Sequence, residues 1–139
     1  MKKVTGIGGV FFKAKNPQAM YRWYEEHLGI NGSPEEGVVF RWKEATAPNE
    51  EGLTAWSIFS NDTDYFGSSK TGFMINYRVA NLQDLLHSLE AQGVKILGQQ
   101  DFDYGRFAWI QDLEGNRIEL WEPPSTINAN PSDETTPTP

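Results

Sequence analysis

The chain contains no cysteine and only two histidines, His27 and His87, among its 139 residues. Disulfides, thiolate metal sites and cysteine nucleophiles are therefore excluded, and a site built on several histidines of one chain is not expected. Positive charge is also scarce, because 12 lysines and arginines face 19 acidic residues and the formal net charge is −7. Since nucleic acids and anionic membrane surfaces are bound by basic patches, we expect the protein to bind neither.

Long apolar runs are missing as well. The longest run near the N-terminus, Val4–Phe12, contains three glycines and is followed by Lys13 and Lys15. A secretory signal needs a longer apolar stretch and a small-residue cleavage site, and a transmembrane helix needs about 20 apolar residues. We therefore predict a cytoplasmic protein without a membrane span.

The last residues differ in composition from the rest of the chain. Five of the eight prolines lie between Pro123 and Pro139, and Ile127 is the one large apolar residue of this stretch. Such a segment cannot bury enough apolar surface to offset the entropy lost on ordering. We predict one folded domain over residues 1–123 and a disordered Pro/Thr-rich tail over residues 124–139.

The body of the chain repeats one pattern. In each half an apolar strand leads to an asparagine, Asn16 or Asn81, which is followed by an amphipathic helix; the two asparagines are 65 positions apart. Asparagine is a favoured helix N-cap, and Pro17 occupies the first helical position of the first helix. The sequence therefore predicts the same strand–helix unit twice.

More strand-like segments follow each helix. The first half contains VVFRWK and LTAWSIFS, and the second contains GRFAWIQD and NRIELWEP. Short strands around Val94–Leu97 and Gly32–Pro34 would complete the pattern. We predict an α+β fold of two tandem β-α-β-β-β modules, about 4–61 and about 71–123, joined by a linker at Asp62–Thr71.

Two stretches of the chain carry a specific pattern. They are NPQAMYRWYEEHLGI (Asn16–Ile30) and YGRFAWIQDLEGNRIELWEP (Tyr104–Pro123), with the Asp-x-x-Gly-Asn turn before Ile-Glu-Leu as the most specific feature. In these stretches the chain resembles the vicinal oxygen chelate superfamily, which includes glyoxalase I, extradiol dioxygenases, methylmalonyl-CoA epimerase and bleomycin-resistance proteins. The resemblance implies an open, cup-shaped mixed sheet with the helices on its convex side. It also implies a homodimer with pockets near the subunit boundary.

The resemblance further implies where metal ligands would lie. Metal-dependent members place His, Glu or Gln ligands on four strands, and the matching positions here are Gly9, Ser57 (or Trp56), Met74 and Glu119. Strand alternation favours Ser57 over Trp56. A glycine offers no donor and a thioether suits soft ions, so one carboxylate remains. We predict no metal ligand and no cofactor; a divalent metal completed by residues of a partner chain stays open.

Aromatic residues make up 13% of the chain, which is many for so small a core. Strand alternation predicts that some of them face the cup with a few polar groups. The predicted ligand-binding residues are Trp42, Ser57, Met74, Asn76, Arg78, Tyr104, Arg106, Glu119 and Trp121, and Glu119 is the candidate acid–base catalyst. Two simpler roles stay open: the tryptophans fill the cup or a dimer interface, or Arg78 and Glu119 form an internal ion pair.

Two connecting segments are expected to border the cup. We predict that Asp101–Arg106 is a mobile loop at its rim. The linker carries Tyr65 and Phe66 among polar residues, where exposed aromatics would suit a lid or a dimer contact.

The sequence favours a small-molecule-binding protein, similar to the bleomycin-resistance branch, that holds an aromatic or cationic organic molecule in the cup. The first alternative is an enzyme with an altered site, either a metal-dependent lyase, isomerase or dioxygenase of the same superfamily or a protein that uses Glu119 as a general base. The second alternative is a protein-interaction module with a Trp-rich surface. Whether any reaction is catalysed is left open.

Overall fold

A computed structural model describes residues 3–43, 51–67 and 71–124. The predicted tail therefore lies outside the described residues, except for Pro124. In chain order the elements are β1 (Val4–Ala14), α1 (Pro17–Leu28), β2 (Val38–Lys43), β3 (Glu51–Ser60), β4 (Phe73–Val79), α2 (Leu82–Ala91), β5 (Gly98–Phe102), β6 (Gly105–Gln111) and β7 (Arg117–Glu122).

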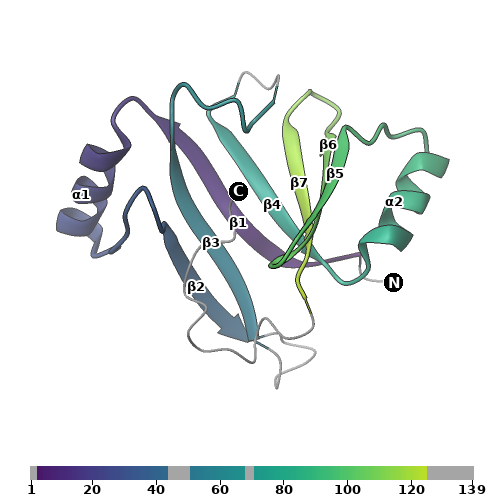
Figure 1. Ribbon diagram of the computed structural model, residues 1–139, viewed down its shortest axis with the longest axis horizontal. Coiled ribbons are helices and arrows are strands. Elements are labelled where there is room, and N and C mark those ends of the chain that lie inside the picture. Colours follow the sequence, from purple (N-terminus) through teal and green to yellow (C-terminus); the bar gives the residue numbers. More distant parts are fainter. Residues whose placement is uncertain (1–2, 44–50, 68–70, 125–139) are drawn as a thin grey trace.

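The strands form one open mixed sheet in the order β2-β3-β1-β4-β7-β6-β5 (Figure 1). β1 is parallel to β3 and β4 is parallel to β7, whereas all other neighbours are antiparallel. Each module thus places its first strand beside its last, and β1 and β4 join the modules in the middle of the sheet. The predicted α+β fold with two modules of the β-α-β-β-β type is confirmed.

The two modules share one register. Phe11 of β1 lies opposite Ser57 of β3, and Asn76 of β4 lies opposite Glu119 of β7. Phe11 and Asn76 are 65 positions apart, which is also the spacing of the two helix-capping asparagines. Ser57 is therefore the counterpart of Glu119 in the first module, as strand alternation predicts.

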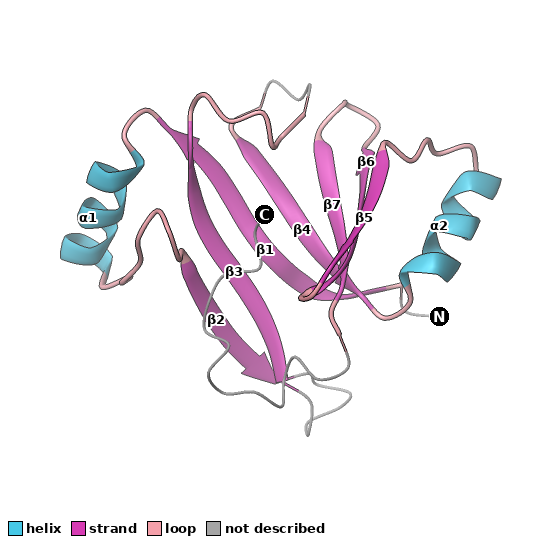
Figure 2. Ribbon diagram, viewed as in Figure 1, coloured by secondary structure: helices cyan, strands magenta, loops and turns pink. Residues whose placement is uncertain are grey.

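Both helices begin at their predicted asparagines. The side-chain oxygen of Asn16 accepts from the Ala19 N–H at 3.0 Å, and that of Asn81 accepts from the Asp84 N–H at 3.1 Å. α1 ends at Leu28 and is capped by Gly29, which has a φ of 71°. Figure 2 shows the helices at opposite ends of the sheet. α1 and α2 are the helices of the described residues, and neither is long and apolar enough to cross a membrane.

The sheet separates two layers of packing. On one face α1 covers Phe12 and Ile58, and α2 covers Ala108 and Leu120. The other face, called the inner face below, carries a core of mostly aromatic side chains: Phe11, Leu53, Ala55, Phe66, Met74, Phe107, Trp109 and Trp121. Trp109 and Trp121 thus fill this face, which is one of the roles that the sequence left open for the tryptophans.

The strand expected at Gly32–Pro34 is wrong. The Gly37 N–H donates to the carbonyl of Ser33 at 2.7 Å, and the Glu36 N–H donates to the Ser33 hydroxyl at 3.3 Å, so this segment is a turn. Serine and glycine at these positions favour such a turn over a strand. Among the described residues, the first module therefore has two strands after its helix where the second has three.

The strand expected at Val94–Leu97 is displaced, because β5 begins at Gly98. Val94 and Ile96 are apolar for a different reason, since they pack against the core under α2. β5 is an edge strand whose residues are mostly exposed, so it lacks the apolar alternation that reveals a half-buried strand.

The loop expected at Asp101–Arg106 is a tight hairpin instead. Phe102 of β5 pairs directly with Gly105 of β6, and only Asp103 and Tyr104 lie between them. Gly105 has a φ of 137°, which residues with a side chain rarely adopt. Strand pairing therefore holds a segment that its polar sequence predicted to be mobile.

Candidate functional site

Glu119 is completely buried in the middle of the inner face. β7 places it between Asn76 of β4 and Trp109 of β6, its direct neighbours across the strands. Its Oε1 accepts from the Asn76 amide at 2.7 Å, and its Oε2 accepts from the Trp109 indole N–H at 3.0 Å. The Tyr65 hydroxyl also donates to Oε2. All three donors are neutral, so the carboxylate is solvated by dipoles.

Burial raises the pKa of Glu119, because the charged form loses its hydration. The hydrogen bonds from Tyr65, Trp109 and Asn76 and the positive charge of Arg117 oppose this shift but do not outweigh it. The pKa of the Tyr65 hydroxyl is raised too, first by burial and then by the charge of Glu119. The site can therefore hold a carboxyl proton at a higher pH than an exposed glutamate does.

Tyr65 and Phe66 are not exposed, in contrast to the expectation for the linker. Phe66 is fully buried in the inner-face core. Tyr65 stacks on Phe59 with ring centroids 5.6 Å apart, and its hydroxyl reaches Glu119. Both residues fold back over the sheet because they bring apolar rings to an aromatic face. The sequence analysis does not place Tyr65 and Trp109 beside Glu119. For Tyr65, the signal that points to a buried role is its place in a pair of adjacent aromatics within a polar linker.

Asn76 has an unused acceptor at this site. Its amide nitrogen donates to Glu119, whereas its Oδ1 is buried without a hydrogen-bond partner. Gly8 leaves the room for this oxygen, since a Cβ there would collide with Asn76 Oδ1 and with the Trp121 ring. The carboxylate and this oxygen can therefore both accept hydrogen bonds from a ligand group that bears donors.

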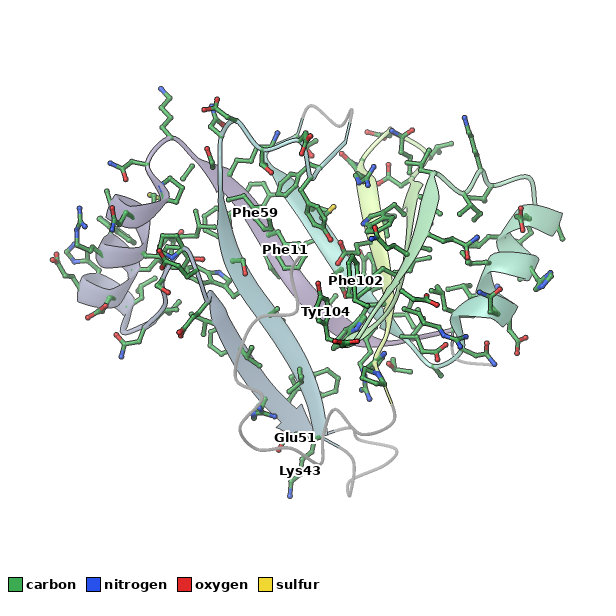
Figure 3. All side chains as sticks on the ribbon, viewed as in Figure 1. Phe11, Lys43, Glu51, Phe59, Phe102 and Tyr104 are labelled. Carbon is green, nitrogen blue, oxygen red and sulfur yellow. The ribbon has the colours of Figure 1, made fainter. Side chains whose placement is uncertain are left out.

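Three more predicted residues belong to the same group. Met74 and Trp121 are each 1% exposed in the inner-face core, and the Trp121 indole N–H donates to the Tyr104 carbonyl at 2.8 Å. Burial, followed by the charge of Glu119, raises the pKa of Tyr104. Figure 3 shows Tyr104 and Phe102 on the side of the β5–β6 hairpin, with Phe11 and Phe59 on the side of β1 and β3.

Trp42 and Arg78 form a neighbouring pair. The Arg78 guanidinium carbon lies 5.7 Å from the centroid of the Trp42 ring, and the Trp42 indole N–H donates to the Thr54 hydroxyl at 2.8 Å. A Cβ on Gly6 or Gly52 would enter the space of this ring. The pair borders the Glu119 group through Arg78, which lies opposite Trp121 in the sheet.

Ser57 and Arg106 lie apart from Glu119. Ser57 is buried and lines a pocket at the outer edge of β3. Arg106 is exposed and alternates with Phe107, which faces the inner face, so it shares the α2 side with Ala108. The structure therefore brings five predicted residues together, with Trp42 and Arg78 beside them: Met74, Asn76, Tyr104, Glu119 and Trp121.

The positions that the resemblance assigns to metal ligands do not offer a donor set for a hard divalent cation. The Phe11 ring occupies the space beside Gly9, Met74 offers a thioether, and both oxygens of Glu119 accept hydrogen bonds from the chain. Within ranges 3–43, 51–67 and 71–124, no three His, Cys, Asp or Glu side chains are grouped so as to hold a metal ion.

In comparisons with known proteins, the chain is similar to solved structures. No protein-family model and no curated protein sequence matches the chain. Methylmalonyl-CoA epimerase from Mycobacterium tuberculosis is 20% identical, with a TM-score of 0.60 and coverage of 94% of this chain and 95% of that one. A variant of the Streptomyces coelicolor methylmalonyl-CoA epimerase, in complex with 2-nitronate-propionyl-CoA, is 14% identical, with a TM-score of 0.63 and coverage of 88% and 99%.

A solved structure that is not named as an epimerase is similar as well. The NAD-dependent benzaldehyde dehydrogenase from Legionella pneumophila is 15% identical, with a TM-score of 0.53 and coverage of 84% of this chain and 98% of that one. Identities this low establish the fold, and a fold hosts unrelated activities. With its two modules and its open mixed sheet, the chain has the fold of the vicinal oxygen chelate proteins.

Proposed function

We propose that the protein binds a small organic cation on the inner face, with the cationic group beside Glu119. The observation that carries this proposal is a fully buried carboxylate whose three hydrogen-bond donors are neutral. A buried negative charge without a cation in contact is costly, and a bound cation relieves that cost. The unused Asn76 Oδ1 adds a second acceptor for an ammonium proton.

The surroundings of Glu119 suit a positive charge. Tyr65 and Trp109 approach edge to face with centroids 6.4 Å apart, and Phe107 stacks beside Trp109. Aromatic faces attract cations through their quadrupoles. This face already holds two such contacts of its own, because Lys13 lies over Phe66 and Arg117 lies over Trp109.

Tyr65 is the partner that a ligand would replace. Asn76 and Trp109 are fixed by strands, whereas Tyr65 belongs to the segment between β3 and β4. A ligand ammonium that takes the place of the Tyr65 hydroxyl keeps a donor on Glu119 and adds a positive charge. The predicted binding residues Met74, Asn76, Tyr104, Glu119 and Trp121 are kept in this proposal, and Tyr65 and Trp109 are added.

The matched probes for this site are benzylammonium and the neutral benzyl alcohol. We expect benzylammonium to raise the melting temperature saturably and to quench tryptophan fluorescence, because Trp109 and Trp121 lie in the site. Glu119→Gln keeps the side-chain shape and removes the charge, so it should abolish both responses; the exposed Glu90→Gln is the control. An equal response to benzyl alcohol, or a response retained in Glu119→Gln, would overturn the proposal.

A second candidate is proton transfer on a carbon acid, with Glu119 as the general base. The raised pKa of Glu119 favours it, because an acid–base group works best near the ambient pH. Exchange of an acidic C–H proton in heavy water, followed by NMR with small carbonyl compounds, tests this role. Exchange that Glu119→Gln slows at least about a hundredfold would support it, and equal rates in both proteins would reject it. The homodimer and the cytoplasmic location stay predictions.

A further inference from the structure

A pocket of about 440 Å³ lies at the outer edge of β3, apart from the Glu119 group. It is called the β3-edge pocket, and its lining residues are Pro17, Pro34, Glu35, Glu36, Gly37, Ser57, Ile58, Phe59 and Ser60. In Figure 1 the chain between α1 and β2 rises between the helix and β3. Residues 34–37 of this connection line the pocket. Its volume is in the range of small-molecule sites.

The pocket exists because β2 stops short. The pairing of β2 with β3 ends at Val38 and Trp56, whereas the pairing of β1 with β3 continues to Ser60. Beyond Trp56 the outer edge of β3 therefore faces α1 and the 34–37 turn instead of a strand. The Ile58 N–H on this edge donates to the Tyr21 hydroxyl at 2.9 Å.

Ser57 brings an unsatisfied hydroxyl to this pocket. The residue is 6% exposed, and its Oγ is buried without a hydrogen-bond partner. A buried hydroxyl that makes no hydrogen bond costs stability, so a ligand that bonds to it recovers that cost. Ser57 also lines the pocket, so a molecule bound there lies beside this residue.

Charge selects the kind of molecule. Among the described residues that line the pocket there are two carboxylates, Glu35 and Glu36, and no lysine, arginine or histidine. The negative charge of Glu35 also acts on the Tyr21 hydroxyl and, after burial as the larger cause, raises its pKa. Glu35 therefore adds negative charge that acts on the Tyr21 hydroxyl.

We propose that the β3-edge pocket is a second binding site, separate from Glu119, for the ammonium group of a small aliphatic amine. Glu35 and Glu36 supply the counter-charge, Ser57 Oγ accepts one hydrogen bond from the ammonium group, and Pro17, Pro34 and Phe59 contact the methylene groups. The proposal stands independently of the cation proposed for the inner face.

The test uses the full chain, with diaminobutane as the probe and the neutral butanediol of the same length as its control. In amide NMR spectra, diaminobutane should shift Gly37 and residues 57–60 saturably, and butanediol should leave them unchanged. Glu35→Gln combined with Glu36→Gln should weaken binding at least about tenfold, as expected for the loss of charge-assisted hydrogen bonds. Glu90→Gln combined with Glu114→Gln removes the same charge elsewhere and should leave the affinity unchanged.

Two further variants test the contribution of Ser57 and the independence of the pocket from the inner face. Ser57→Ala should weaken diaminobutane binding and raise the melting temperature, because it removes an unsatisfied hydroxyl; a lower melting temperature with unchanged binding would overturn the role of Ser57. In Glu119→Gln, diaminobutane should still shift the amide signals of Gly37 and residues 57–60 with unchanged affinity, and loss of these shifts would overturn the separateness of the site. Equal weakening in the two double variants would reduce the effect to general attraction by an acidic protein and reject the pocket.

Discussion

The Tyr65 hydroxyl donates a hydrogen bond to Glu119, which lies 54 positions later in the chain. One partner comes from the connection between the modules and the other from the last strand of the second module. The contact therefore links the connecting segment to the most buried charge-bearing group of the inner face.

Tyr65→Phe removes this donor and keeps the ring that stacks on Phe59. We expect the free energy of unfolding at neutral pH to fall by about 1–3 kcal/mol, because a buried carboxylate loses one of its hydrogen bonds. Urea denaturation measures the change. Tyr77→Phe is the control, since Tyr77 packs on the opposite, α2 side of the sheet. Equal losses in the two variants would contradict a specific role for the Tyr65 hydroxyl.

The stability of the native protein relative to Glu119→Gln should fall as the pH rises. The pKa of Glu119 is raised above its usual value of 4.5, so the folded protein holds this proton more tightly than the unfolded chain. Its contribution is fully present below pH 4.5, is lost as the pH rises through the folded pKa, and is constant above it. The neighbouring Tyr65 and Tyr104 stay neutral in this range, because their pKa values are raised as well.

Urea unfolding of both proteins at a series of pH values measures that difference. Other carboxyls titrate alike in the two proteins and cancel, including Asp112, whose pKa is lowered by the hydrogen bonds that it accepts from Asn116. If the stability of the native protein relative to Glu119→Gln rose with pH instead, Glu119 would be ionised more easily in the folded protein than in the unfolded chain.

Ser57→Ala should raise the free energy of unfolding by about 1 kcal/mol, because the hydroxyl is buried and unpaired. Ser60→Ala removes an exposed hydroxyl that accepts from the Asp62 N–H at 3.2 Å, and it should lower the same quantity slightly. Chemical denaturation of the two variants checks the opposite signs. A loss of stability in Ser57→Ala would mean that this hydroxyl is satisfied in the folded protein.

Gly8→Ala should destabilise the protein by about 1–3 kcal/mol, since the new methyl group would enter the space of Asn76 and Trp121. Gly72→Ala is the matched control, because no atom lies within 4 Å of a Cβ at that position. Thermal unfolding of both variants measures the difference. Comparable melting temperatures would indicate that Asn76 can move away without cost.

Local signals in the sequence are enough to predict most of the fold. Asn16 and Asn81 cap the two helices and are 65 positions apart, which is also the spacing of Phe11 and Asn76 in the paired strands. The repeat of the modules is therefore visible in the sequence. The short strand expected directly after each helix is not predicted correctly. β5 is an exposed polar edge strand, and the Gly32–Pro34 segment forms a turn.

The candidate site is predictable only in part. Glu119, Asn76 and Met74 share one face by strand alternation, and the structure places them there. Tyr65 and Trp109 are missed for this role because their contacts with Glu119 depend on tertiary folding. Arg106 is predicted at the cup because its polar segment resembles a loop, whereas strand pairing turns this side chain to the α2 side.

The aromatic rings of Tyr65 and Phe66, in the connection between the modules, also limit how this protein can be divided. Residues 62–71 look like the natural place to separate two half-size fragments for complementation, because they join two copies of one unit. Phe66 is fully buried there, and Tyr65 completes the hydrogen bonds of a residue in the other half. A first fragment that ended at Asn61 and a second that began at Gly72 would both lack these rings. A working split protein must therefore keep Tyr65 and Phe66 attached to one of its halves.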